Sequence, residues 1–180
     1  IAEYERYAEE ARPPGLELEV IRSWHDDPGF VGFLAARLRE ALRRAGDRTP
    51  VVFTAHSIPT PAGDRGDPYA DQLAETCALV ASRAEIGDWR FAYQSAGRTE
   101  ETWLGPDVLE VIGSLAGGGA TGVVVQSIGF VADHLEILYD LDVEARRLAE
   151  SRGLAFTRAR MPNDDPDFVA ILADIVAPML

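Results

Sequence analysis

The sequence predicts an α/β domain built on a doubly wound, mostly parallel sheet with helices on both faces. Short apolar runs alternate along the chain with longer segments whose apolar residues recur every three or four positions, the spacing of an amphipathic helix. The run Val51–Ala55 is apolar at nearly every position, which is typical of a strand buried on both faces. Regular alternation of such strands and helices indicates parallel strands joined by helical crossovers.

The elements are expected in a regular order after a first helix at residues 1–11. We expect strands at residues 16–22, 50–55, 89–94, 122–127 and 154–158, and helices at residues 28–45, 68–83, 106–115, 133–152 and 166–176. Three of these helices open with an Asp-Pro pair, in which the aspartate is the expected N-cap: Asp27, Asp67 and Asp165. The glycines 117–119 follow a helix and precede a strand, the reverse of the order in a phosphate-binding loop, so they are interpreted as a helix stop.

Length and composition fit one domain, residues 1–180, and exclude several classes of function. The net charge of −13 argues against a nucleic-acid partner, because phosphate binding needs a basic surface. All 17 basic residues are arginine, which excludes Schiff-base chemistry on lysine and a P-loop lysine. Cys77 is the only cysteine, so no disulfide can form within the chain and a cytoplasmic location is expected. No apolar run approaches the roughly 20 residues of a transmembrane helix.

The three histidines of the chain, His25, His56 and His134, all lie at or just beyond the carboxyl end of an expected strand. In open parallel sheets these ends form the crevice in which ligands bind. Ser57, Gln94, Ser95 and Asp133 occupy the same positions of neighbouring strands. The sequence therefore predicts one polar site at this edge of the sheet.

His56 is a candidate metal ligand or base, although a locally hydrogen-bonded histidine is the plainer interpretation of this strand alone. A serine hydrolase is excluded, because adjacent strand residues such as His56 and Ser57 point to opposite faces and the chain has no G-x-S-x-G elbow. His25 precedes the N-cap Asp27, and a structural role is expected for it. Trp103, in the loop after the third expected strand, is interpreted either as a hydrophobic plug or as the apolar wall of a pocket for a flat ligand.

A row of carboxylates follows the strand at residues 122–127. In a regular helix Glu136, Asp140 and Glu144 share one face, and the first two have no basic residue three or four positions away. A cation bound along the row would explain this arrangement. Asp133 and Glu136 also have the spacing of a capping box, which would occupy both without any function. His134 lies about 200° around a regular helix from Glu136, so the predicted metal ligands are His56 and Glu136, with His134 in support.

Four motifs together resemble the ferrochelatases, the lyases that insert ferrous iron into porphyrin in haem biosynthesis. They are T-A-H-S-I-P at residues 54–59 with G-D-P-Y at 66–69, Y-Q-S-A-G-R-T-E-E-T-W-L-G-P at 93–106, G-F-V-A-D-H-L-E-I-L-Y-D-L-D at 129–142, and M-P-N at 161–163. They occur in the family's order and cover most of residues 50–170. The residues of the second and third motifs are most similar to those of the bacterial branch that uses coproporphyrin III.

The resemblance implies roles for these residues. His56 and Glu136 would bind the incoming Fe²⁺, which is a substrate, and His134 would assist catalysis. Asp140 and Glu144 would form an acidic path or a site for a second divalent cation. Porphyrin would contact Trp103, Ser57, Gln94 and Ser95. No iron–sulfur cluster is expected, because the chain lacks the cysteines for one.

The family holds its porphyrin between two domains, and the present chain resembles only the carboxyl-terminal one. The helix at residues 1–11 is therefore expected to link to an absent amino-terminal domain, and activity of the visible domain alone is not implied. Because coproporphyrin carries four carboxylates, its binding is expected to use arginines such as Arg98 or groups of the other domain. Two alternatives are a cobalt or iron chelatase acting on a sirohydrochlorin-type tetrapyrrole, and a non-catalytic module that binds tetrapyrrole or metal.

Overall fold

The computed structural model describes residues 2–60, 67–97 and 99–179, and contains a four-stranded, entirely parallel sheet. The strands are β1 (Val51–His56), β2 (Trp89–Gln94), β3 (Gly122–Ser127) and β4 (Ala155–Arg158), in the spatial order β2-β1-β3-β4. Val51 pairs with Trp89 on one side and with Val124 on the other, so β1 is central. The predicted fold class is confirmed.

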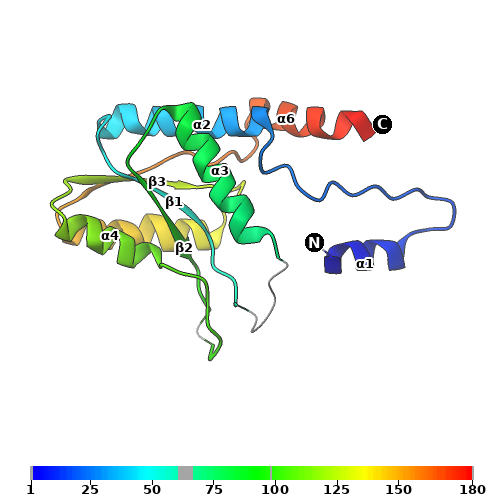
Figure 1. The fold of residues 1–180 in the computed structure, drawn as a ribbon, viewed down its shortest axis with the longest axis horizontal. Coiled ribbons are helices and arrows are strands. Elements are labelled where there is room, and N and C mark those ends of the chain that lie inside the picture. Colours follow the sequence, from blue (N-terminus) through cyan, green and yellow to red (C-terminus); the bar gives the residue numbers. More distant parts are fainter. Residues whose placement is uncertain (1, 61–66, 98, 180) are drawn as a thin grey trace.

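Helices cover both faces of the sheet (Figure 1). They are α1 (Ala2–Ala11), α2 (Pro28–Ala45), α3 (Tyr69–Ala84), α4 (Val108–Gly117), the π-helix η1 (Ile137–Ala145) continued by α5 (Arg146–Ser151), α6 (Pro166–Val176) and the short 3₁₀ turn η2 (Ala177–Met179). One core joins α2, α3 and α6 to side chains of β1 such as Phe53. The other joins α4, η1 and α5 to the opposite face, which presents Val52 and Val125. None of the described helices is long and apolar enough to span a bilayer.

The Asp-Pro pairs act as the sequence predicts, with one shift. Asp27 caps α2 by accepting the backbone N–H of Phe30 at 2.9 Å, and Asp165 caps α6 through the N–H of Asp167 at 3.1 Å. The helix expected from Pro68 begins at Tyr69, whose N–H is accepted by the Asp67 carboxylate at 2.9 Å. An aspartate before proline therefore satisfies a free N–H of the first turn in each case.

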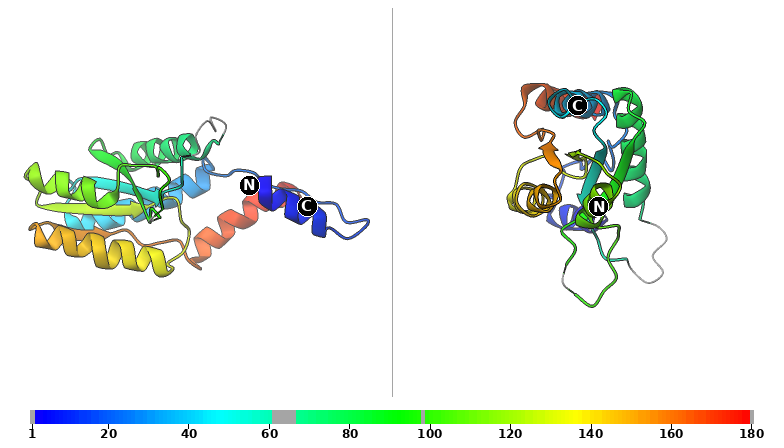
Figure 2. Two further views of the ribbon diagram at one scale, coloured as in Figure 1. Left: turned by 90° about the horizontal axis from the view of Figure 1, so that it is seen from below. Right: turned by 90° about the vertical axis from the view of Figure 1, so that its left-hand side faces the viewer.

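The strand expected at residues 16–22 is wrong. Among the described residues this segment has no strand partner and runs extended and largely exposed, with Leu16 54% and Val20 40% accessible. Its alternation of apolar and acidic residues fits a strand with one buried face, but strand pairing also requires a free sheet edge beside it. Figure 2 shows α1 and this segment projecting away from the body of the domain, on the side to which α6 also extends.

The helix expected at residues 133–152 begins later in the chain than predicted, and its central turns are wider than those of an α-helix. Asp133 and His134 precede it, and its centre, η1, is a π-helix with i→i+5 hydrogen bonds in place of the regular α-helix. Hydrophobic spacing could not reveal this, because Ile137, Leu141 and Ala145 are fully buried and are spaced by four, which suits either helix. The wider turn begins at the residues proposed to act on metal.

Successive crossovers create the crevice. The connection after β1 passes over one face of the sheet through α3, whereas the connection after β3 passes over the other face through η1 and α5. Neighbouring strands whose connections leave in opposite directions form a topological switch point, where ligands of such sheets bind. His56 ends β1 at this point, and Glu136 follows β3.

Candidate metal centre

His56 and Glu136 come together at the switch point. The distance from His56 Nε2 to Glu136 Oε2 is 3.6 Å, with 32% of the His56 side chain and 53% of the Glu136 side chain exposed. Two ligands of one tetrahedral ion, bound at 2.0–2.2 Å as in zinc sites, lie roughly 3.4 Å apart. The observed separation is thus close to what a shared divalent ion requires, and both groups are open to solvent.

The imidazole of His56 is held in one tautomer. Its Nδ1 lies against the backbone carbonyl of Ser57. A carbonyl oxygen only accepts, so Nδ1 must carry a hydrogen, and in the neutral ring the lone pair is then on Nε2, the nitrogen nearer Glu136. The tautomer therefore leaves Nε2 free to bind a cation or to accept a proton.

Tyr69 steadies the backbone behind this ring. Its hydroxyl donates a hydrogen bond to the His56 carbonyl at 2.9 Å. Burial, with smaller contributions from Tyr93 and Asp67, raises the pKa of Tyr69 to about 12, so the hydroxyl remains a donor across the physiological range. On the other side of β1, the N–H of Ser57 donates to the Gln94 carbonyl at 2.8 Å.

The ring of Phe130 contacts both His56 and His134. Phe130 has its ring centroid 5.9 Å from that of His56 and 4.8 Å from that of His134. The prediction that His134 and Glu136 face apart assumed a regular helix, but His134 precedes the first helical turn. Its ring is consequently not bound by helical geometry, and it packs against Phe130, which also contacts His56.

The capping-box interpretation of Asp133 and Glu136 is not what the structure contains. Glu136 makes no side-chain cap hydrogen bond at the start of η1. The Asp133 carboxylate instead accepts from Arg158 and Asn163, each at 2.9 Å. Glu136 therefore keeps its oxygens for the crevice.

The other carboxylates of the row differ in their surroundings. The Ser95 hydroxyl, on a residue with a φ of 62°, donates a hydrogen bond to Asp140, which is half-buried. Glu144 is exposed one step further along η1. Asp107, the N-cap of α4, lies close enough to be affected: burial, then Glu110 and Asp140, raise its pKa above the usual value. The acidic surface thus continues from η1 to the start of α4.

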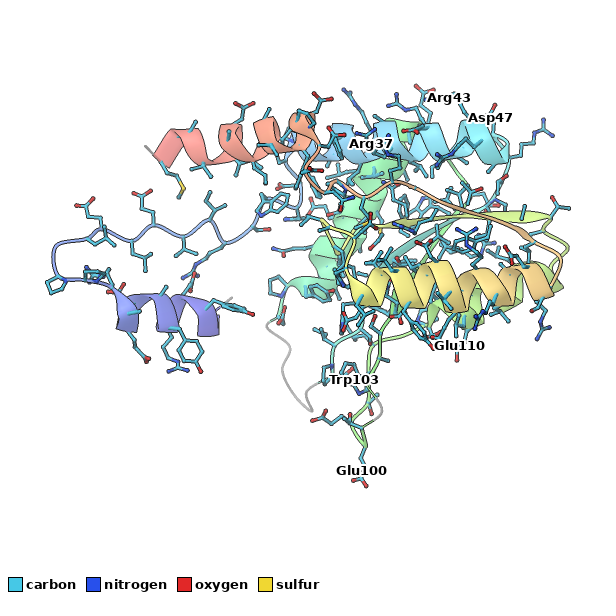
Figure 3. The ribbon with its side chains drawn as sticks, turned by 180° about the vertical axis from the view of Figure 1, so that it is seen from behind. Arg37, Arg43, Asp47, Glu100, Trp103 and Glu110 are labelled. Atoms are coloured by element: carbon cyan, nitrogen blue, oxygen red, sulfur yellow. The ribbon has the colours of Figure 1, made fainter. Side chains whose placement is uncertain are left out.

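The four residues expected to contact porphyrin differ in burial and in their contacts. Ser57 is fully buried and donates to the Leu104 carbonyl at 2.7 Å. Gln94 is fully buried, and neither polar atom of its amide has a hydrogen-bond partner. Trp103 is half-buried in the loop that extends beyond the sheet, with Glu100 at the tip of that loop (Figure 3). Ser95 is the member of this group that contacts the acidic row.

His25 has partners of its own, as the expected structural role requires. Its Nε2 lies 2.9 Å from Glu75, its Nδ1 lies 2.6 Å from the Ser23 hydroxyl, and Asp26 is 3.8 Å away. His25, Asp26 and Glu75 are close enough to share a cation. Both carboxylates are exposed and both ring nitrogens are already in hydrogen-bond contact, which is the arrangement of a surface ion pair.

A largely apolar hollow of about 220 Å³, with His25 in its wall, lies between α3 and the residues that follow β3. Its wall includes Trp24, Tyr69, Leu73 and Ile128. Tyr69 also donates to the His56 carbonyl and so connects the wall of the hollow with the end of β1, while neither His56 nor Glu136 lines the hollow.

A sequence model of the family described as Ferrochelatase matches residues 1–180. The chain belongs to the ferrochelatase family. Similar proteins include the ferrochelatase of Herpetosiphon aurantiacus, 45% identical across 89% of this chain and 54% of its own length, and that of Thermus thermophilus, 41% identical across 98% and 57%. The coproporphyrin III ferrochelatase of Geobacillus sp. is 38% identical across 94% of this chain and 56% of its own length. The chain spans about half the length of the curated relatives it matches.

Membership of the ferrochelatase family agrees with the motifs from which it was expected. Gly66 of the G-D-P-Y motif and Arg98, the arginine expected near the porphyrin carboxylates, lie outside the described residues. Sequence reasoning missed Phe130 and Tyr69 as neighbours of His56, although both stand inside the quoted motifs. The aromatic Phe130 four residues before His134 was the available signal.

Proposed function

We propose that the protein containing this domain is a ferrochelatase that inserts Fe²⁺ into a porphyrin, with coproporphyrin III as the preferred substrate. The observation that carries the proposal is the 3.6 Å approach of His56 Nε2 to Glu136 Oε2 at the switch point. Family membership supports the reaction, and relatives named coproporphyrin III ferrochelatase support the substrate.

The reaction exchanges two pyrrole protons for one metal ion. Fe²⁺ must lose its water while two N–H bonds of the macrocycle break, and both protons leave to bases or solvent. An imidazole and a carboxylate suit a divalent ion that has to be passed on, because they bind less tightly than thiolates would. The Nε2 lone pair of His56 can hold the ion or take a pyrrole proton, and Glu136 supplies the second ligand. His134 assists from the far side of Phe130.

The acidic row extends this site. Asp140 and Glu144 would guide Fe²⁺ toward Glu136 or hold a second divalent cation, and the net charge of −13 favours the approach of cations from solution. Ser95 fixes Asp140 by its hydrogen bond. Carboxylate oxygens bind divalent cations, so Asp140 and Glu144 on one helix support a path for Fe²⁺ toward Glu136.

The porphyrin would lie over the crevice, with Trp103 as one apolar wall and Ser95 at the floor, above the buried Ser57 and Gln94. The walls would hold the macrocycle bent, so that its pyrrole lone pairs face the iron. Since the chain covers 54–57% of its relatives' lengths, we propose that an amino-terminal domain supplies the rest of the pocket and joins through residues 1–11. A cytoplasmic location belongs to the same proposal, supported by the single free cysteine, Cys77, which is buried.

The test uses the protein with its amino-terminal half present. In His56→Ala, kcat for Fe²⁺ insertion should fall by about 100-fold or more, while porphyrin binding, followed by absorbance titration, stays within twofold of the parent. Glu136→Gln should raise the KM for Fe²⁺. His25→Ala and Glu150→Gln are the matched controls, because they remove a histidine and a surface carboxylate away from the crevice. Normal turnover in His56→Ala would disprove the site.

Two other outcomes would replace the proposal. Faster metallation of sirohydrochlorin than of coproporphyrin, with cobalt or iron, would identify a chelatase for reduced tetrapyrroles. Saturable binding of porphyrin or iron with no metallation would identify a carrier. The comparison requires the same preparation in all three assays.

A further inference from the structure

One arginine ties the η1 segment to strand β4. Arg158, the last residue of β4, donates from Nε and Nη2 to the two oxygens of Asp142 at 2.9 and 2.8 Å. Its Nη1 donates to Asp133 at 2.9 Å. The Arg158 side chain is only 13% exposed. A planar guanidinium that grips one carboxylate with two bonds fixes orientation as well as distance.

Asn163, in the M-P-N turn, completes the same anchor. Its side-chain amide donates to Asp133 at 2.9 Å, and its side-chain oxygen accepts the Asp133 backbone N–H at 2.7 Å. Its own N–H donates to the Val131 carbonyl at 2.8 Å. The φ of Asn163 is 50°, a left-handed conformation that asparagine adopts more readily than most residues. This geometry accounts for the asparagine of the M-P-N motif.

The two anchored aspartates bracket the candidate metal ligands. Glu136 and Asp140 lie between Asp133 and Asp142 along the chain, and no side chain caps the start of η1. A π-helix is rare and is frequently found at functional sites. Arg158 ties the segment before η1 and a residue within η1 to the same strand, which fixes the stretch between them.

The charges of the network reinforce the geometry. Burial acts to lower the pKa of Arg158, but the hydrogen bond and charge of Asp142, and then Asp133, outweigh it and raise that pKa above its ordinary value. Arg146 also reaches Asp142, at 3.5 Å, but it is the more distant partner. Arg158 is thus the principal cation that holds η1.

We propose that Arg158 is a positioning residue for the metal centre: by holding Asp133 and Asp142, it fixes the backbone from which Glu136 and Asp140 reach the crevice. The inference rests on the proposed function and deepens it. Outer partners that orient metal ligands typically change metal affinity or activity by about 10–100-fold when they are removed. None of the described contacts of Arg158 reaches His56 or Glu136, so its action is indirect.

The chain offers a control pair of similar burial. Arg37 of α2 pairs with Asp165 at the start of α6, with side-chain exposures of 18% and 17%, on the face of the sheet opposite η1. Arg37→Gln breaks a half-buried ion pair that shares no residue with the Arg158 network. Comparison of Arg158→Gln with Arg37→Gln separates positioning from general loss of stability.

The experiment measures Co²⁺ affinity, by calorimetry, together with separate KM values for Fe²⁺ and porphyrin in the protein with both halves. Arg158→Gln should weaken Co²⁺ binding and raise the KM for Fe²⁺ by about tenfold or more, with the KM for porphyrin within twofold of the parent. Arg158→Lys should recover part of the loss. Arg37→Gln should lower Tm with both metal readouts unchanged.

Asp142→Asn keeps the shape of the carboxylate and serves as the milder variant if Arg158→Gln fails to fold. Asp142→Asn should also weaken Co²⁺ binding. The double variant Asp142→Asn/Arg158→Gln should bind Co²⁺ little more weakly than Arg158→Gln alone. Parental Co²⁺ affinity in folded Arg158→Gln or Asp142→Asn would overturn the proposal, as would an equal metal defect in Arg37→Gln. If His56→Ala abolishes turnover while these variants bind metal normally, positioning fails and the proposed function stands. Normal turnover in His56→Ala would remove the proposed function itself.

Discussion

Gly129 lies directly against Ala55, with no room for a side chain between them. A Cβ placed on Gly129 would come within 2.6 Å of the Ala55 Cβ and 3.0 Å of its Cα. The N–H groups of Ile128 and Gly129 both donate to the Thr54 carbonyl, at 2.9 and 3.3 Å. This close approach brings the chain after β3 to the end of β1, and so brings Phe130 and His134 beside His56.

Gly129→Ala should therefore separate the two halves of the metal centre. The added methyl meets backbone and a short side chain that cannot rotate away, so the loop must move. We expect a loss of about 1–3 kcal/mol in the free energy of unfolding and a fall in metallation larger than that of a remote variant with equal stability. Chemical denaturation and turnover with Fe²⁺ check the two parts.

Gly113→Ala is the control for this substitution. Gly113 lies inside α4, and a Cβ there would meet nothing within 4 Å. Alanine in a helix interior is favoured over glycine by roughly 0.5–1 kcal/mol, so Gly113→Ala should stabilise the protein and leave turnover unchanged. Equal behaviour of the two variants would show that the Gly129 contact has no part in the site.

The sheet and most of its helices could be predicted because local signals and burial agree. Val51–Ala55 is apolar at nearly every position, and Asp27 and Asp165 stand where a helix needs a cap. The strand at residues 16–22 failed because alternation specifies a face to bury but not an edge to pair with. The π-helix escaped prediction because residues spaced by four fit both helix types. The anchor formed by Arg158 and Asn163 joins residues up to 30 positions apart, which no local pattern reveals.

The contact between Gly97 and Trp103 allows a test of whether Trp103 is a hydrophobic plug or the apolar wall of a porphyrin pocket. A Cβ on Gly97 would come within 2.4 Å of the Trp103 ring, whose Nε1 donates to the Thr99 hydroxyl at 2.9 Å. Gly97→Ala should turn the ring out of place. If Trp103 is a porphyrin wall, the KM for porphyrin should rise several-fold with Tm nearly unchanged, because the loop is largely exposed.

Gly87→Ala provides the comparison, since Gly87 is also exposed in a loop and a Cβ there would meet nothing within 4 Å. Gly87→Ala should change neither the KM for porphyrin nor Tm. A drop in Tm in Gly97→Ala with an unaltered KM for porphyrin would instead support the hydrophobic plug.

Asp107 should make stability fall as pH rises. Burial raises the pKa of this carboxyl above its value of 3.8 in model compounds, so the folded state binds the proton more tightly than the unfolded state. Its contribution is then fully present below about pH 3.8 and is lost as pH rises through the folded pKa. Asp107→Asn keeps an N-cap acceptor but has no charge. It should raise Tm at pH 7 by on the order of 1–2 °C, and the gain should vanish in acid. A variant less stable than the parent at pH 7 would contradict this.

Cys77 should be unreactive in the folded protein. It is fully buried on the inner face of α3, and burial raises the pKa of its thiol to about 12, so almost no thiolate is present or accessible at pH 8. Labelling of the Cys77 peptide by a disulfide reagent, followed by mass spectrometry, should therefore proceed only through opening of the domain, and its rate should rise with denaturant. Cys77→Ser should destabilise the protein more than Cys77→Ala, because the hydroxyl would be buried without an assured partner. Rapid labelling in native buffer would mean that α3 opens away from the sheet far more often than its packing implies, and the hydrogen bond from Tyr69 to His56 would then be no stable support for the metal centre.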